Sequence, residues 1–363
     1  MNRCPACGTQ YADDARFCTK DGSKLIAMPG MVAPPSLAPS AVSMPTPARG
    51  TAHGRAEPPT PASPTNLVDQ VLDGRYKIVR KVGEGGMSFV YLANDTATSD
   101  RYAIKVLSQA LSNDQNAMQR LKREASLGMR LAHPNVCHII RMGETQDGLV
   151  YVVMPFVEGE ILSDRNNRMG TLPVAEVARF VSEIAAGLHV AHELKIVHRD
   201  LKPENIMICK TEDGSERAVV MDFGLAKERR ADAELQKLTA TGIILGTPEF
   251  MSPEQLRGKP LDPRTDVYSL GLMTYEMLTG KLPFTGRTQQ EMMIARLRSE
   301  PVPLRQARPD LDLSEAVEKV LAKSMQRAPD DRYTTAPEFA AALSAAIGGK
   351  QGDSGVLGRL FGR

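Results

Sequence analysis

The chain has 363 residues, with 45 Lys and Arg against 43 Asp and Glu, so its formal net charge is +2. Hydrophobic residues make up 42% and charged residues 24%, values typical of soluble globular proteins. This composition excludes a fully disordered chain, a collagen and a membrane-embedded protein. The near-neutral charge also excludes a strongly basic nucleic-acid binder.

Three composition regimes follow one another along the chain. Residues 1–26 are short, mixed in charge and contain three cysteines. Residues 27–66 contain ten of the 25 prolines and almost no charge, so we expect a disordered, partly polyproline-II linker that continues to residue 71. The pattern is globular over residues 72–347, and the Gly-rich residues 348–363 are expected to form a flexible tail.

The order of predicted elements indicates a small sheet-rich lobe followed by a larger helical lobe. Three strand-like runs lie within residues 75–107, a helix is predicted over 114–131, and strands are predicted around 137–142 and 149–154. An apolar stripe of helical period over 174–194 predicts an amphipathic helix, and residues 266–279 are apolar on nearly every side, as in a buried helix. A ligand is expected in the cleft between the lobes.

Two motifs of the first lobe suggest phosphate binding. GEGGMSFVY, residues 83–91, lies between two predicted strands, and its glycines would let the backbone approach phosphates closely. Alone it is no better supported than an ordinary Gly-rich hairpin, and the strand after it distinguishes it from dinucleotide-binding motifs. Lys105, in AIKVL, has apolar neighbours that face away from it, and it could pair with Glu124 of the next helix.

Two motifs of the second lobe carry acid, base and metal chemistry. HRDLKPEN occupies residues 198–205, and DFG occupies residues 222–224. Asn205 and Asp222 offer the hard oxygen ligands that Mg²⁺ prefers. Asp200 can accept a proton from an alcohol, and Lys202 can neutralise a transferring phosphoryl group.

Taken together, these motifs resemble the eukaryotic-like protein kinase family, specifically bacterial Ser/Thr kinases. The Gly-rich loop, strand Lys, helix Glu, HRDLKPEN, DFG and GTPEFMSPE (246–254) occur in the family's order over about Arg75 to Ala345. The resemblance implies an α+β, bilobal protein kinase fold over residues 72–347. It also implies transfer of the γ-phosphate of ATP to protein Ser/Thr hydroxyls, with Mg²⁺ or alternatively Mn²⁺.

Carried over residue by residue, the resemblance assigns a site. Asp200 would be the catalytic base, Lys202 would contact the γ-phosphate and Lys105 the α- and β-phosphates. Asn205 and Asp222 would hold Mg²⁺. The implied ATP-binding residues are Gly83, Glu84, Gly85, Gly86, Met87, Ser88, Val90, Ala103, Lys105, Glu124, Met154, Val157 and Met207. Pro155 departs from the common Glu of the hinge, but a proline keeps the carbonyl that faces adenine.

The resemblance also implies structural roles. His198 and Phe223 would stack between the lobes, Glu254 would pair with Arg332, and Asp266 would brace the HRD backbone. Gly128 stands where many kinases have a larger apolar residue, which leaves open what holds the helix there. His189 and His192 show no partner in the sequence.

Activation-loop phosphorylation is the regulation we expect. Arg199 precedes the catalytic Asp200, a feature of kinases that this modification activates, and Thr239 and Thr241 lie in the loop at 225–246. A phosphothreonine there could pair with Arg199 and order the loop. The alternative is that both threonines are merely solvated.

The first 26 residues resemble a small zinc ribbon. CPACG (4–8) and Cys18 suit a tetrahedral metal, and Asp21 stands at the fourth position. The site could be Cys4, Cys7, Cys18 and Asp21, could recruit another ligand, or could bind weakly, and free thiols remain the alternative. A segment this short has too small a core to fold unaided, which favours a metal. Partner docking is its expected function.

Other functions remain as alternatives. A pseudokinase scaffold that docks partners through the ribbon would need a missing catalytic group, and nucleic-acid binding would need a basic patch that the sequence lacks. A homodimer is compatible with the family. Protein substrates are the expected partners, with no nucleic acid and no membrane span, because no stretch reaches ~18 consecutive apolar residues.

The expected setting is reducing and cytoplasmic. The five cysteines are an odd number, including Cys137 and Cys209, and three of them crowd into the first 18 residues, which does not suggest a disulfide framework. The N-terminal MNRCPACG has no apolar run of the kind found in a signal peptide.

Overall fold

The computed structural model describes residues 67–85, 88–107, 115–145, 148–223, 248–311 and 313–348, together with the backbones of three short strands near the N-terminus. The chain divides into two compact units, Met1–Pro59 and Thr60–Arg363. In the first unit, β1 (Asn2–Arg3) pairs antiparallel with both β2 (Gln10–Tyr11) and β3 (Ile26–Ala27).

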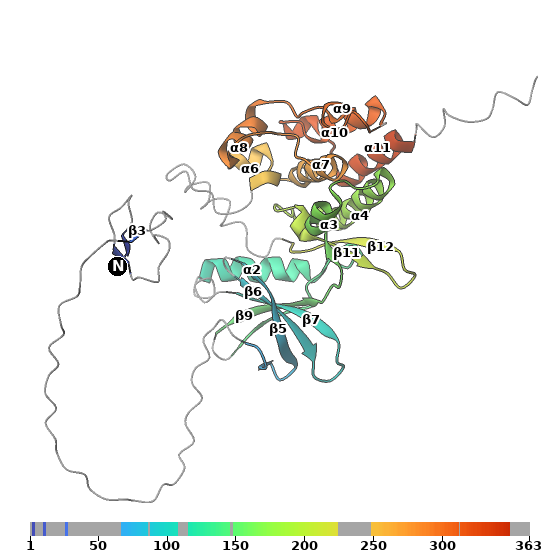
Figure 1. The fold of residues 1–363 in the computed structure, drawn as a ribbon. Coiled ribbons are helices and arrows are strands. Elements are labelled where there is room, and N and C mark those ends of the chain that lie inside the picture. Colours follow the sequence, from blue (N-terminus) through green and yellow to red (C-terminus); the bar gives the residue numbers. More distant parts are fainter. Residues whose placement is uncertain are drawn as a thin grey trace, which may run out of the picture. The chain divides into compact units, whose positions relative to one another are not determined.

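A six-stranded antiparallel sheet opens the second unit (Figure 1). In the order β4-β5-β6-β7-β9-β8, its strands are Val71–Leu72, Tyr76–Gly85, Ser88–Asp95, Arg101–Leu107, Val150–Pro155 and Arg141–Glu144. Successive side chains along a strand face opposite sides of its sheet. Ile104 and Val153 therefore enter one buried cluster, whereas Ala103 and Val152 enter another.

The second of these clusters lies beneath helix α2 (Gln115–Gly128). Met118, Leu121 and Ala125 recur at helical spacing, and all three are buried against the sheet. The same cluster includes Val219 of the following lobe, so apolar packing continues from the sheet to the helical part of the unit.

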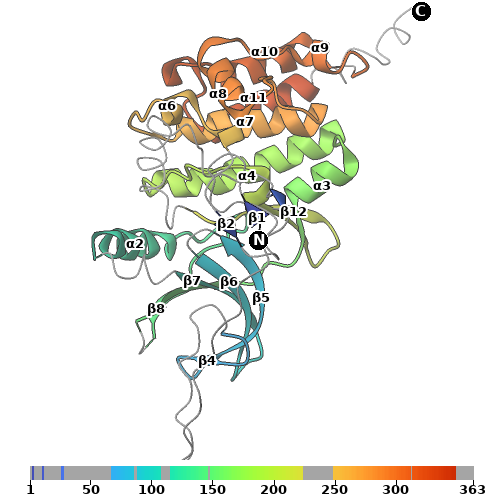
Figure 2. The ribbon, with the colours of Figure 1, turned by 60° about the vertical axis from the view of Figure 1, so that its left-hand side comes forward.

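The helical lobe is drawn in Figure 2. It contains the largest hydrophobic cluster among the described residues of the second unit. Its helices are α3 (Leu162–Met169), α4 (Val174–Glu193), α6 (Pro253–Leu256), α7 (Arg264–Thr279), α8 (Gln289–Arg298), α9 (Leu304–Ala307), α10 (Glu315–Ser324) and α11 (Ala336–Gly348). Helix α7 packs on α4, α10 and α11, which explains why it is apolar on nearly every side. Short 3-10 turns occur at Pro203–Asn205, Pro248–Phe250 and Pro329–Asp331.

A second sheet, made of three short strands, belongs to the helical lobe. The strand order is β10-β11-β12, with bounds Glu160–Ile161, Ile206–Lys210 and Glu216–Val220. The bilobal arrangement predicted from the sequence is therefore confirmed. Among the described residues, none of the helices is both long enough and apolar enough to span a lipid bilayer.

One predicted strand is shorter in the structure. The sequence predicts a strand around 137–142, whereas β8 begins at Arg141. The preceding residues pair elsewhere: Val136 forms a parallel bridge with Val220, and the backbone N–H of Cys137 donates to the carbonyl of Val220 at 2.9 Å. This segment is thereby held against the strand that leads into DFG.

Candidate active site

Strand β7 presents Lys105 to the second lobe. Ile104 and Val106 on either side of it are buried in the sheet, as their alternation predicts. The Nζ atom of Lys105 lies 2.8 Å from Oδ1 of Asp222. Burial acts to raise the pKa of Asp222, but the charge and hydrogen bond of Lys105 outweigh it, so the pKa lies below its ordinary value.

A loop after α4 carries the HRD motif, and α7 fixes its backbone. The two carboxylate oxygens of Asp266 accept the backbone N–H groups of His198 (2.8 Å) and Arg199 (3.0 Å). Arg199 has a φ of 64° and Asp222 a φ of 55°, both in the left-handed region that non-glycine residues seldom adopt. The bracing role expected of Asp266 is confirmed, and it holds one of these two strained positions.

His192 is a further member of this network, which the sequence did not reveal. Its Nε2 lies 2.8 Å from Oδ2 of Asp266, and both side chains are buried. Burial acts to raise the pKa of Asp266, but hydrogen bonds and nearby charge, chiefly from His192, bring it below its ordinary value. The interpretation of His192 as a residue without a partner was wrong, because its partner lies 74 residues away along the chain.

Asn205 connects the groups expected to carry the chemistry. Its Nδ2 donates to the carbonyl (2.7 Å) and to Oδ2 (2.9 Å) of Asp200. The backbone carbonyl of Asn205 accepts the N–H of Met221 at 2.8 Å, and Met221 immediately precedes Asp222. Lys202 Nζ lies 3.4 Å from Oδ2 of Asp200. Contacts therefore join Lys105 to Asp222 on one side, and Asn205 and Lys202 to Asp200 on the other. The backbone bond between Asn205 and Met221 links the two groups, because Met221 directly precedes Asp222.

The rings of His198 and Phe223 lie behind these contacts, with centroids 4.9 Å apart and an interplanar angle of 69°. The expected contact between them is confirmed. His198 Nδ1 accepts the N–H of Asp200 at 3.3 Å, and Nε2 lies 2.8 Å from the carbonyl of Met221. Both contacts are satisfied by a neutral ring with its proton on Nε2. His198 thus links the backbones on either side of the site.

The described residues expected around adenine share one apolar cluster. Ala103 and Met154 are buried opposite each other in β7 and β9, and Val90, Val157 and Met207 pack against the same cluster. In the Gly-rich hairpin, Gly85 pairs with Ser88. Gly86, Met87 and the side chain of Glu124 lie outside the described residues.

Gly128 allows α2 to approach the sheet closely. A Cβ atom at residue 128 would lie 2.8 Å from Cδ1 of Ile139, too close for an undisturbed contact. Ile139 is buried and fills the space that a larger residue at 128 would need. The end of α2 therefore packs closely against Ile139, in the segment that precedes β8.

The other expected structural pair is also present. Arg332 donates twice to the carboxylate of Glu254, at 2.7 Å in each bond, and both residues are buried. The pairing is confirmed. Several other predicted positions, however, lie outside the described residues: Cys4, Cys7, Cys18, Asp21, Thr239 and Thr241. No group of three or more potential metal ligands of the His, Cys, Asp and Glu types occurs among the residues that are described.

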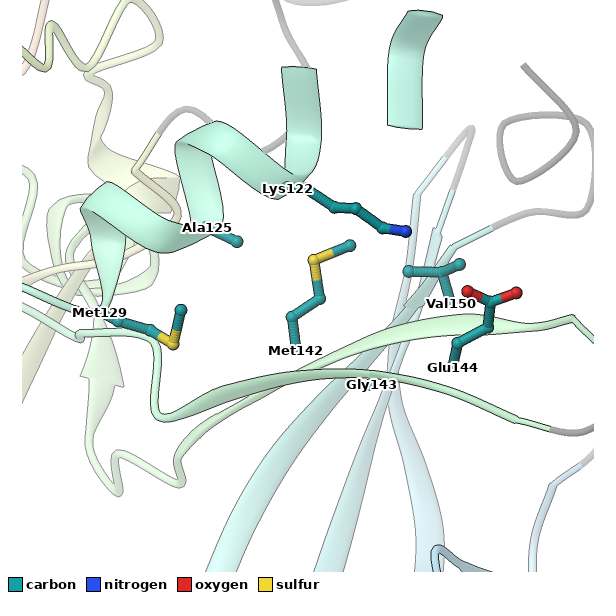
Figure 3. Close-up of a pocket in the computed structure, with 7 residues that line it drawn as sticks. All are labelled: Lys122, Ala125, Met129, Met142, Gly143, Glu144 and Val150. Atoms are coloured by element: carbon teal, nitrogen blue, oxygen red, sulfur yellow. The ribbon is translucent and has the colours of Figure 1, made fainter. Parts of the chain in front are cut away.

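A separate pocket of about 360 Å³ lies between α2 and strands β8 and β9. It is lined by Lys122, Ala125, Met129, Met142, Gly143, Glu144 and Val150. Figure 3 shows Lys122 extending toward Val150 and Glu144, with Met129 at the opposite end. None of these residues belongs to the nucleotide-binding set that the sequence predicts.

Comparisons with known proteins agree with this geometry. The family model described as "Protein kinase domain" matches residues 76–343. The chain is 36% identical over 278 residues to the serine/threonine-protein kinase pkn3 of Myxococcus xanthus, covering 77% of this chain and 51% of that protein. It is 38% identical over 277 residues to PknB of Mycobacterium leprae, covering 75% and 43%.

A solved structure is similar as well. The kinase domain of Mycobacterium tuberculosis PknI matches with a TM-score of 0.60 and 29% identity, over 77% of this chain and all of that one. The chain spans about half the length of the curated relatives it matches.

Proposed function

Because the chain belongs to the protein kinase family, we propose that it is a Ser/Thr protein kinase that transfers the γ-phosphate of ATP to protein hydroxyls. The observation that carries this proposal is the pairing of Lys105 with Asp222 and of Asn205 with Asp200, linked by the backbone bond between Met221 and Asn205. The pseudokinase alternative requires the loss of a catalytic group, and each of these four groups is present.

Asp200 is the proposed base. Its Oδ2 accepts the Asn205 amide and lies near Lys202, which fixes the direction of the carboxylate. From there it orients the attacking hydroxyl and takes its proton, while Lys202 balances charge on the transferring group. Most of the rate enhancement then comes from positioning and from electrostatic stabilisation.

Asn205 and Asp222 are the proposed Mg²⁺ ligands, and their free atoms fit a hard cation. The amide nitrogen of Asn205 is used by Asp200, which leaves its oxygen as a ligand. One oxygen of Asp222 contacts Lys105, which leaves the other, and the lowered pKa keeps this carboxylate charged at neutral pH. When bound, Mg²⁺ or Mn²⁺ would neutralise charge on the β- and γ-phosphate oxygens.

Lys105 is the proposed ligand of the α- and β-phosphates. The adenine would lie among Ala103, Met154, Val157 and Met207, beneath the hairpin at 83–88 and Val90. The apolar cluster that these residues share supports this position. Glu124 keeps its proposed role as the partner of Lys105 in the active arrangement.

The test of the proposed activity is phosphate transfer to a general protein substrate. We expect Asp200→Asn to lower kcat by about 10²–10⁴-fold while ATP binding is retained, because the base acts on the hydroxyl and not on the nucleotide. Asp331→Asn, at an exposed acid, is the matched control and should leave kcat unchanged. Full activity in Asp200→Asn would refute the assignment.

We further propose activation through phosphorylation of Thr239 or Thr241, with the phosphate paired to Arg199. Mass spectrometry after incubation with ATP should find phosphate on this loop in the native chain and none in Asp200→Asn. An active enzyme with an unmodified loop would refute the proposal.

Residues 1–26 are proposed to be a zinc module for partner docking, with Cys4, Cys7, Cys18 and Asp21 as ligands. The three antiparallel strands support a small ribbon, since β1 ends at the residue before Cys4. Elemental analysis should find one zinc per chain, lost in Cys4→Ser. A native chain without metal would refute this module.

A further inference from the structure

The hinge between the lobes, residues 155–159, is fixed on its C-terminal side by a close backbone approach. A Cβ at Gly159 would lie 2.2 Å from the carbonyl oxygen of Ile208, so only glycine allows this approach. The next residue, Glu160, pairs with Ile208 in the β10–β11 ladder. This end of the hinge therefore belongs to the second lobe.

Arg101 fixes the other end, through three separate contacts. Its carbonyl accepts the N–H of Phe156 at 3.2 Å. Its guanidinium forms an ion pair with Glu158, and its Cζ lies 5.8 Å from the centroid of the Phe156 ring. Pro155, directly before, has no N–H to donate to β7. Pro155 itself ends β9 opposite Tyr102, and Arg101 adds contacts from the first lobe to the two hinge residues beyond it, Phe156 and Glu158.

The position of Arg101 on β7 relates it to the nucleotide. Residues 101, 103 and 105 lie on one face of the strand. A rise of four residues separates Arg101 from Lys105 by about 13 Å along the strand. Lys105 stands at the phosphate end of this distance, Ala103 at the adenine, and Arg101 at the hinge. We propose that Arg101 is a positioning residue that holds the hinge backbone in place for adenine; this inference rests on the proposed kinase function.

The chemistry of the side chain matters to this role. An exposed ion pair contributes little by itself, and both Arg101 and Glu158 are about half exposed. A planar guanidinium can pair with a carboxylate and stack on an aromatic ring at the same time. A lysine ammonium does this less well. Arg101→Lys should therefore be intermediate between the native chain and Arg101→Ala.

The experiment measures dissociation constants of ATP and of adenosine by calorimetry. Arg101→Ala should weaken both ligands by the same factor, about three- to tenfold, because the hinge faces the adenine that they share. Lys105→Met should weaken ATP much more than adenosine. For Arg101→Ala, the KM for ATP should rise by the same factor as the dissociation constant of ATP, while kcat at saturating ATP stays within twofold of the native value.

Two variants guard against an effect on folding. Glu158→Gln leaves Arg101 in place and should weaken both ligands about twofold. Arg75→Ala removes an arginine of matched exposure, with its own carboxylate and aromatic contacts, in the turn before β5, and should change neither affinity.

The outcomes separate the two proposals. Native affinity in Arg101→Ala, or loss of ATP binding with adenosine binding intact, would overturn the role of Arg101. A native chain that binds neither ligand would instead refute the nucleotide site itself, and the role of Arg101 with it.

Discussion

At the scale of single residues, buried carboxylates are stabilised by partners that are distant in sequence. Asp266 has His192 and two backbone N–H groups, and Glu254 has Arg332. Glu276 of α7 differs: its carboxylate accepts a hydrogen bond from the neutral amide of Asn166, at 3.3 Å. Burial and then the charge of Glu204 raise the pKa of Glu276 to about 7.

This raised pKa predicts an unusual dependence of stability on pH. Between about pH 4.5 and 7 the folded chain keeps the Glu276 proton that the unfolded chain has released, so this residue makes stability fall as pH rises. Glu276→Gln should be more stable than the native chain at pH 8, by about 1–3 kcal/mol, and equal to it near pH 4.5.

Urea denaturation of both proteins at the two pH values measures the effect. Glu338→Gln, on the exposed side of α11, is the matched control and should show no such difference. Equal stability of Glu276→Gln and the native chain at pH 8 would contradict the prediction.

Residue types and spacing indicated which side chains would form the proposed site. Lys105, Asp200, Asn205 and Asp222 stand in short motifs whose order suggests their roles, and the structure brings Lys105 to Asp222 and Asn205 to Asp200. His192 was missed because a histidine on an apolar helix face is usually a packed core residue. Only the folded chain places it beside Asp266.

At the scale of elements, hydrophobic period predicted the long helices and the central strands well. The strand expected at 137–142 was placed too early, because apolar residues that pack beneath a helix look like strand residues in sequence. The backbone N–H of Cys137 instead donates a hydrogen bond to Val220 of β12, and regular pairing with β9 begins at Arg141. No local pattern reveals such a partner.

Helix α2 and the segment before β8 meet at a pair of matched size, Gly128 and Ile139. Gly128→Leu should push the helix from the sheet and lower kcat/KM at least tenfold, since α2 carries Glu124. Ile139→Ala should leave a cavity and cost about 2–4 kcal/mol of unfolding free energy. The double variant should recover part of both losses, because the leucine would fill the vacated space.

Activity and urea denaturation of the four proteins form a double-mutant cycle. Ser126→Leu, on the exposed side of the same helix, is the control for adding a leucine and should be nearly neutral. Strictly additive effects in the cycle would show that Gly128 and Ile139 act independently, against this prediction.

At the scale of the whole second unit, a few buried polar links hold segments that apolar packing alone would leave free to shift. Glu254 lies in the first turn of α6, and Arg332 follows the 3-10 turn at Pro329–Asp331, 78 residues later. Burial acts to raise the pKa of Glu254, but the hydrogen bonds and charge of Arg332 bring it below its ordinary value. Its contribution is therefore present above about pH 4.5 and is lost as pH falls through the folded pKa.

Breaking this link should reduce stability rather than chemistry. Arg332→Ala leaves the Glu254 charge buried without its partner, so we expect a loss of about 3–5 kcal/mol of unfolding free energy. Arg168→Ala is the matched control, because Arg168 also donates twice to a carboxylate, that of Glu160, but at the exposed surface. It should change stability little.

Denaturation curves give the free energy of unfolding. Nucleotide titration gives the fraction of folded molecules, by which the measured kcat is divided. Per folded molecule, Arg332→Ala should keep kcat near the native value, because Arg332 contacts none of the groups between Lys105 and Asp200. A large fall in kcat per folded molecule would mean instead that the position of Glu254 controls the active site directly. The stability difference between native and variant chains should narrow as pH falls through the folded pKa of Glu254, since protonation of Glu254 removes the charge that Arg332 stabilises.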